Sequence, residues 1–277
     1  MLLGARLRRL RQTAGITRDN AGRAIRSSGS KISRLELGRT GFKQRDVSDL
    51  LTLYGVGDDD AERAILLGLA RQANNAGWWH GYGDVLPAWF EPYLGLEQAA
   101  TIIRSYEVAF IPGLLQTPEY ARAVIRLMDG VSEAEADQRV ALRVQRQQLL
   151  HRPSPPRLWV VIDETALRRP IGGRGVMLEQ VDYLVRMSRL TNVTVQVMPF
   201  SAGGHAAAGG QATMLRFPEE LLPDVVYQEQ MDSAVYLNKP ADTVHHWNVL
   251  NRVATEALPP DASVAKLRRL ADLILGA

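Results

Sequence analysis

The sequence predicts an α+β protein, in which a small helical N-terminal domain precedes a larger domain of helices and a mostly antiparallel sheet. Apolar residues recur at helical spacing through residues 1–73. Beyond the proline-rich break at 152–156, the pattern changes to short apolar runs rich in β-branched residues. Charge divides the chain as well, since residues 1–77 carry 14 basic and 8 acidic side chains and residues 78–277 carry 19 and 22. We therefore expect a helical domain at 1–73, an aromatic connecting segment at 74–93 and an α+β domain at 94–277.

The first domain is expected to contain five helices. Thr17 and Ser28 are good N-caps for the second and third, because a hydroxyl oxygen can accept a backbone N–H of the first helical turn. Gly38 ends the third helix, at a position where glycine takes a left-handed conformation at little cost. The arginines of the first helix, Arg11 among them, are expected on its wetter sides. The helices are predicted around Leu3–Leu10, Thr17–Ile25, Ser28–Gly38, Asp46–Tyr54 and Asp59–Ala73.

The stretch from Thr17 to Gly38 predicts a helix-turn-helix that binds DNA. The outer face of its second helix is short or cationic, so the helix N-terminus can approach base edges and an arginine can reach a guanine. Residues 1–45 hold 12 lysines and arginines against two acidic residues, a distribution that favours phosphate. The alternative is a plain helix pair with a solvated basic face. We expect base contacts from Ser28, Gly29, Ser30 and Arg34, and DNA-backbone contacts from Arg18, Lys31, Ser33, Arg39 and Lys43.

This stretch resembles the XRE family of Cro-like and phage-repressor-like regulators, whose pattern reads S-Q-x-x-L-A followed by S-x-S-x-I-S-R-x-E-x-G. The resemblance is close from Ser28 onward and implies a five-helix, λ-repressor-like domain. The chain departs from the pattern earlier: Arg18, Ala21 and Gly22 replace Gln, Leu and Ala. Arg26 stands where the turn glycine is usual, and because a non-glycine residue at positive φ costs free energy, a differently shaped turn is expected there.

Aromatic residues are concentrated between the two expected domains, in NNAGWWHGYGDVLPAWFEPY. One interpretation is that they join the domains or cap the second core. The other is a partner-binding or ligand-binding surface, because tryptophan and tyrosine make good anchors. The residues assigned to this surface, together with one histidine of the later glycine-rich loop, are Trp78, Trp79, Tyr82, Trp89, Phe90 and His205.

The second domain alternates helices with short strands. Helices are predicted over 94–104, 118–126, 132–151, 176–190, 242–257 and 263–275. Strands are predicted over 106–111, 158–162, 193–198, 212–217, 225–228 and 234–237. Asp163 and Glu164 follow the second of these strands, where they could act as acid and base or simply cap the next turn; we favour the cap.

Three segments of this half resemble a class of actinobacterial regulators: GWWHGYGDVLPAWFEPYLGLEQAA, SYEVAFIPGLLQTPEYARAVI and VQVMPFSAGGHAAAGG. In that WhiJ-like, antitoxin-like class, an XRE domain is joined to a large domain of formerly unknown function. The resemblance implies a transcription factor that binds a small BldB-like partner protein, and it assigns no catalytic role to any residue.

Enzymatic motifs are not found. The five histidines form no H-E-x-x-H or H-x-x-x-H pattern, the loop at 201–210 is neither a dinucleotide fingerprint nor a P-loop, and there is no G-x-S-x-G. We therefore expect no catalytic residue, no metal and no cofactor. Two alternatives to a partner-binding domain stay open: a small-molecule sensor with a pocket under loop 201–210, and, more remotely, a hydrolytic domain tethered to DNA.

The expected setting is the cytoplasm. The chain has no cysteine, as is common in a reducing compartment, and no apolar run long enough to span a membrane. Because one helix-turn-helix reads only a half-site, we expect a homodimer on a palindromic operator of double-stranded DNA.

Overall fold

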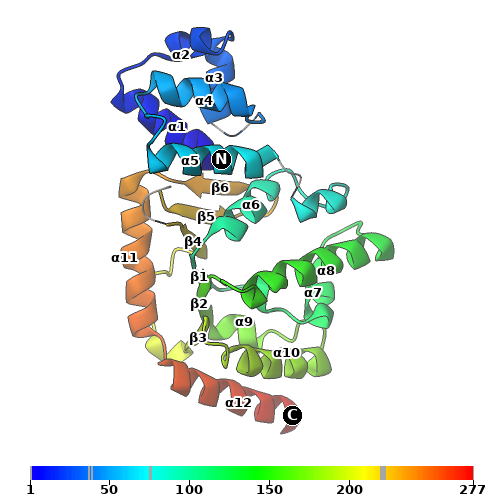
Figure 1. Cartoon of the computed structure of the whole chain (residues 1–277). Helices are drawn as coiled ribbons and strands as arrows, with labels where there is room; N and C mark the ends of the chain where they lie inside the picture. Colours follow the sequence, from blue (N-terminus) through cyan, green and yellow to red (C-terminus); the bar gives the residue numbers. More distant parts are fainter. Residues whose placement is uncertain (1, 37, 39, 75–76, 219–222, 277) are drawn as a thin grey trace. The chain divides into compact units, whose positions relative to one another are not determined.

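The structure is a computed structural model that describes residues 2–36, 38, 40–74, 77–218 and 223–276. The chain divides into two compact units. The N-terminal unit comprises residues 1–80 with 217–223, and the C-terminal unit comprises residues 81–216 with 224–277. Together they make the α+β protein that the sequence predicts, with helices first and a helix-and-sheet region second (Figure 1).

The described part of the N-terminal unit contains five α-helices around one apolar core. Leu7, Ala21, Leu35, Leu50 and Leu66 are buried in it, one from each of the five helices. The helices are α1 (Leu2–Thr13), α2 (Arg18–Ala24), α3 (Gly29–Glu36), α4 (Gln44–Leu53) and α5 (Ala61–Asn74). A short 3-10 helix, η1 (Trp78–Tyr82), follows.

Both predicted caps of the helix-turn-helix are confirmed. The Asn20 amide donates to the Thr17 hydroxyl at 3.2 Å, and the Lys31 amide donates to the Ser28 hydroxyl at 3.3 Å. Each bond satisfies one of the backbone N–H groups that have no partner inside the helix. α2 and α3 therefore begin where the side-chain chemistry of the sequence places them.

The turn between α2 and α3 corrects one expectation. Arg26 takes a φ of 52°, the left-handed region that glycine occupies freely. Arg26 thus adopts the strained left-handed conformation that a glycine would take at this position. The turn keeps its usual shape, and the predicted change of shape is not seen. Gly22 explains how close the two helices come, because an added Cβ there would lie 2.7 Å from the backbone carbon of Ser28.

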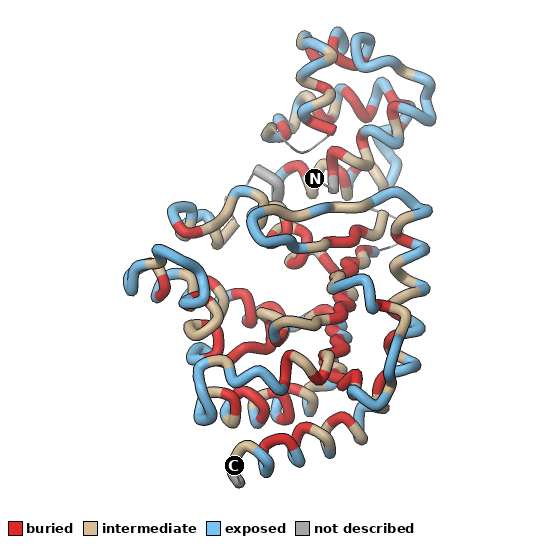
Figure 2. The backbone as a smooth tube through the Cα atoms, turned by 180° about the vertical axis from the view of Figure 1, so that it is seen from behind, coloured by how far each residue is buried: buried red, intermediate tan, exposed pale blue. Residues whose placement is uncertain are grey.

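The C-terminal unit is built on a mixed six-stranded sheet, in the order β3-β2-β1-β4-β5-β6. β1 pairs with β2 and β2 with β3 in parallel, whereas the three remaining pairings are antiparallel. The strands are β1 (Ile102–Glu107), β2 (Arg157–Asp163), β3 (Val193–Met198), β4 (Ala212–Arg216), β5 (Val225–Glu229) and β6 (Ala234–Leu237). Figure 2 shows buried residues concentrated along the central strands.

Helices cover both faces of this sheet (Figure 1). α11 packs on the face that bears Tyr106, Met214 and Val226, with Leu250 and Val253 in the shared core. α6 packs on the opposite face, where Tyr93 contacts Tyr227 of β5. The α-helices of this unit are α6 (Glu91–Ala99), α7 (Pro118–Ile125), α8 (Glu133–Gln147), α9 (Glu164–Arg168), α10 (Arg174–Met187), α11 (Pro240–Glu256) and α12 (Pro260–Gly276). Its 3-10 turns are η2 (Gly113–Leu115), η3 (Gln148–His151) and η4 (Phe200–Ala202).

The first strand corrects the sequence prediction. The expected helix over 94–104 ends at Ala99, and the strand expected over 106–111 runs from Ile102 to Glu107. The strand was misplaced in the prediction because Arg104, a charged residue, is buried in the middle of β1 and interrupts its apolar pattern. Its guanidinium lies 4.8 Å from the Trp159 ring and 4.6 Å from the Trp247 ring, and it donates to the Leu250 carbonyl.

Candidate nucleic-acid interface and C-terminal pocket

The exposed face of α3 carries the residues predicted to read bases. Ser28, Ser30 and Arg34 are exposed, whereas Ile32 and Leu35 on the opposite face are buried. The side chain of Arg34 makes no hydrogen bond or ion pair with any other residue that the structure describes, so its guanidinium is available to a ligand. Gly29 is half-buried, and an added Cβ there would overlap the carboxylate of Asp19 on α2.

The residues predicted to contact the DNA backbone differ in their surroundings. Lys31 bonds to Asp46 of α4 at 2.7 Å and so joins two helices of the unit. Arg18 is about half exposed and lies 3.6 Å from Glu36. Lys43 is exposed at the start of α4, and Ser33 is half-buried. Arg39 lies outside the described residues.

A buried ion pair fixes the far end of α3. Arg11 of α1 donates from Nε and Nη2 to the two carboxylate oxygens of Glu36, at 2.5 and 3.1 Å, and from Nη1 to the Ile16 carbonyl at 2.7 Å. Both side chains are buried, and the hydrogen bond to Glu36 raises the pKa of Arg11. Arg11 is thus a tether inside the unit, contrary to the expectation that it lies on a wetter side of α1.

The aromatic segment is divided between the two units. Trp78 and Trp79 belong to the N-terminal unit and meet edge to face, 5.8 Å between ring centres. In the C-terminal unit the Tyr82 hydroxyl donates to Gln145 of α8 at 2.8 Å. Phe90 stacks on Tyr93 at 5.2 Å and contacts Trp89, Tyr227 and the Arg146 guanidinium. Trp89 and Phe90 therefore cap the second core, one of the two interpretations made from the sequence.

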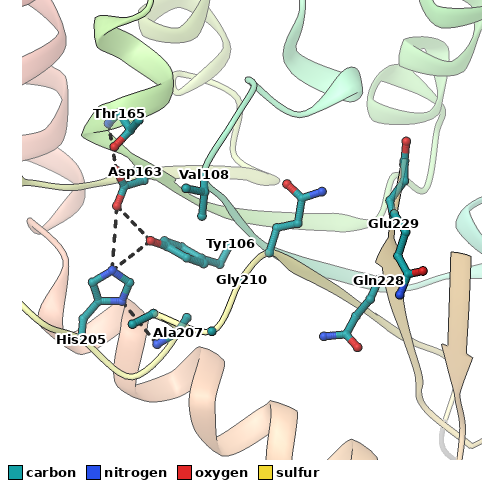
Figure 3. Close-up of a pocket in the computed structure, with 13 residues that line it drawn as sticks. Tyr106, Val108, Asp163, Thr165, His205, Ala207, Gly210, Gln228 and Glu229 are labelled. Atoms are coloured by element: carbon teal, nitrogen blue, oxygen red, sulfur yellow. Dashed lines mark hydrogen bonds and ion pairs between the residues drawn. The ribbon is translucent and has the colours of Figure 1, made fainter. Parts of the chain in front are cut away.

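A pocket of about 650 Å³ lies under the glycine-rich loop of the C-terminal unit. Its walls come from the ends of β1, β2 and β5 and from the loop backbone over 207–210. In Figure 3, Asp163 and His205 lie on one side of the pocket and Gln228 and Glu229 lie on the other. Its polar side chains include Tyr106, Asp163, His205, Gln211 and Gln228, whereas the Glu229 carboxylate accepts from the Tyr227 hydroxyl at 2.8 Å on the other face of β5.

A chain of hydrogen bonds holds the deep end of this pocket (Figure 3). The Ala207 amide donates to His205 Nδ1 at 3.3 Å, which leaves the proton of a neutral imidazole on Nε2. That Nε2–H faces the Tyr106 hydroxyl at 3.0 Å, and the hydroxyl donates to Asp163 Oδ2 at 2.9 Å. Asp163 Oδ1 accepts from the Thr165 amide at 2.8 Å and so caps α9, as predicted.

The protonation of Tyr106 follows from its surroundings. Burial raises the pKa of its phenol well above the usual value, and the hydrogen bond to Asp163 and the negative charge of Asp163 raise it further. The phenol therefore keeps its proton at neutral pH and donates it. Each donor in this chain of hydrogen bonds points toward Asp163, and the Asp163 carboxylate accepts the last bond.

Two protein-family models match separate parts of the chain. A model described as a helix-turn-helix domain matches residues 2–64. A second model, described as a domain of unknown function (DUF5753), matches residues 90–269. The chain belongs to the DUF5753 family. Its N-terminal helix-turn-helix domain indicates a DNA-binding regulator. No curated protein and no solved structure matches the chain.

Two pocket residues of this DUF5753 chain were not assigned to a site from the sequence. Tyr106 was placed only at the start of a strand, and Asp163 was interpreted as a cap, a role that it has together with its place in the pocket. The signal available was that both stand near the ends of their strands, whereas His205 lies in the glycine-rich loop between β3 and β4. Within the described residues, no helix is long and apolar enough to cross a membrane.

Proposed function

We propose that this chain is a sequence-specific transcription regulator that places α3 in the major groove of DNA. The observation that carries the proposal is the exposed face of α3, where Arg34 has no partner among the described residues and the neighbouring Ser28 and Ser30 are short. An arginine can fork onto the two acceptors of a guanine edge, and small residues let the helix backbone come close. The resemblance to XRE regulators supports the same docking.

Phosphate contacts are assigned to the cations that the fold leaves available. Lys43 is exposed at the start of α4 and keeps this role. Lys31 is held by Asp46, so reaching a phosphate would cost it that ion pair. We expect Lys43→Ala to weaken binding to all sequences alike and to reduce the slope of log K against log salt by about one. Measured titrations of operator and unrelated duplexes at several salt concentrations test this.

The functional unit is proposed to be a homodimer on a palindromic operator. One N-terminal unit presents one α3, so two copies are needed to read two half-sites about 34–36 Å apart. Sedimentation of the protein with an operator duplex is expected to give two chains per duplex. If only one chain binds each duplex at saturating protein, the proposed dimer is contradicted. That result would not bear on the proposal that α3 reads bases.

The C-terminal unit is proposed to bind a small regulatory protein, as the resemblance to antitoxin-like regulators implies, and to act by binding rather than by catalysis. Leu127 and Met128, after α7, support this because both are large apolar residues with at least half of their surface exposed. We expect a BldB-like protein encoded beside this chain to form a complex of fixed stoichiometry with it. Leu127→Asp is expected to weaken that complex, and the exposed Arg157→Asp should leave it unchanged. A regulator of this kind works in the cytoplasm, where the DNA is.

A further inference from the structure

We propose that the pocket of the C-terminal unit binds a small organic cation, an amine, amidine or guanidine. This goes beyond the proposed DNA-binding function and does not depend on it. The pocket of about 650 Å³ has the size of ordinary small-molecule sites, and its lining includes the carboxylate of Asp163 and no lysine or arginine. Such a lining repels anions and attracts positive charge.

Asp163 supplies the negative charge of the pocket. Only 13% of its side chain is exposed, and no lysine or arginine is paired with it in the part of the chain that the structure describes. A carboxylate this far from water is stable only when it is well hydrogen-bonded or paired with a positive group. The structure provides the hydrogen bonds and leaves the positive group to a ligand.

The neutral donors around Asp163 leave it acceptor capacity. Tyr106 donates to one carboxylate oxygen and the Thr165 amide to the other, which uses two of about four lone-pair positions. His205 Nε2 lies 3.9 Å away and is turned to the Tyr106 hydroxyl. An ammonium or amidinium ion brings two or three N–H donors and one positive charge, which match the remaining positions.

The outer part of the pocket suits the rest of such a molecule. Gln211 and Gln228 line it with amide groups that both donate and accept. An added Cβ at Gly209 or Gly210 would meet nothing within 4 Å, so the loop leaves open space there. A second cavity of about 190 Å³ shares Tyr106 and Gln228 with the first and reaches α11, which gives an elongated cation room to extend.

A neutral polyol is the competing ligand class, because carboxylates and amides also bind sugar hydroxyls. The unpaired charge of Asp163 favours the cation, since a neutral ligand would leave that charge uncompensated. The two classes respond differently to Asp163→Asn, which keeps the shape of the side chain and removes its charge.

The test is ligand-observed NMR on the full chain with three sets of probes: agmatine, putrescine and benzamidine as cations, ribitol and N-acetylglucosamine as neutral compounds, and citrate and AMP as anions. We expect at least one cation to bind, the anions not to bind, and Asp163→Asn to weaken the cation at least tenfold. The control Asp182→Asn, which removes the same charge from the exposed side of α10, should change its affinity less than twofold.

Gln228→Glu is the second pocket variant and keeps the test decisive if Asp163→Asn fails to fold, which melting curves will show. It adds a negative charge to the pocket and keeps the size of the side chain, so it is expected to tighten cation binding. The proposal is overturned if no cation binds, if neutral probes or anions bind as tightly, or if the pocket variants bind cations as the native chain does. None of these results bears on DNA binding, which is measured separately.

Discussion

The buried ion pair between α1 and α3 allows a stability prediction worked from the geometry. Glu36→Gln removes the negative charge that faces Arg11 and keeps the size of the side chain. The side chains of Arg11 and Glu36 are 8% and 3% exposed, and Arg11 is also held by the Ile16 carbonyl at 2.7 Å, so it cannot turn out to water without losing that bond. The substitution therefore leaves a positive charge buried without its partner.

Removing one partner of a buried ion pair typically costs about 3–5 kcal/mol. Because glutamine can still accept one hydrogen bond, we expect the lower end, about 3 kcal/mol. Glu62→Gln is the matched control. It breaks the ion pair of Arg6 with Glu62, whose side chains are 19% and 23% exposed. Because this pair is less buried and a fully exposed pair is worth about 0.2–1 kcal/mol, we expect a smaller loss than for Glu36→Gln.

Native-state hydrogen exchange of the α3 amides at Ile32 and Leu35 measures this effect, because it reports the free energy of opening within one region of a chain. A loss of about 3 kcal/mol corresponds to roughly a hundredfold faster exchange. The reasoning is refuted if Glu36→Gln speeds exchange no more than Glu62→Gln does.

Three further predictions concern the turn and the sheet. Gly22→Ala would place its Cβ 2.7 Å from the backbone of Ser28, so it should destabilise the N-terminal unit by about 1–3 kcal/mol in urea unfolding, and an unchanged midpoint contradicts the close approach. Arg26→Gly removes the cost of a positive φ and should stabilise the unit by about 0.5–1 kcal/mol, with a lower melting temperature as the contrary result. Burial raises the pKa of Glu107 from 4.5 to about 8, so the unfolded carboxyl loses its proton first and the free energy of unfolding falls as pH rises between those values. Glu107→Gln should flatten that fall in urea unfolding, and an unchanged pH slope would show that Glu107 does not cause it.

Local chemistry explains the elements that could be predicted from the sequence. The side-chain caps at Thr17 and Ser28 depend on residues three positions apart, and each was placed correctly. The strand Val193–Met198 was predicted to the residue, because its β-branched alternation is bounded by turn residues. Where residues close together in the sequence determine an element, the sequence pattern was sufficient to predict that element.

Long-range contacts explain what could not be predicted. Tyr106 is 57 residues from Asp163 and 99 from His205, so the chain of hydrogen bonds at the pocket exists only after the sheet has formed. Arg104 in β1 and Arg11 in α1 are charged side chains in buried positions. Each buried charge is stabilised by partners that are distant in the sequence. Composition and periodicity do not reveal such partners.

The central claim is that α3 reads base edges through Arg34. The most direct measurement is sequencing of duplexes selected from a random pool by the native chain, by Arg34→Ala and by the control Arg8→Ala, which removes the same charge from an exposed position on α1. We predict a palindromic motif for the native chain, loss of preference at one base pair of each half-site with Arg34→Ala, worth about 1–3 kcal/mol, and an unchanged motif with Arg8→Ala. The same motif recovered by Arg34→Ala, or salt-dependent binding with no motif for the native chain, contradicts the account.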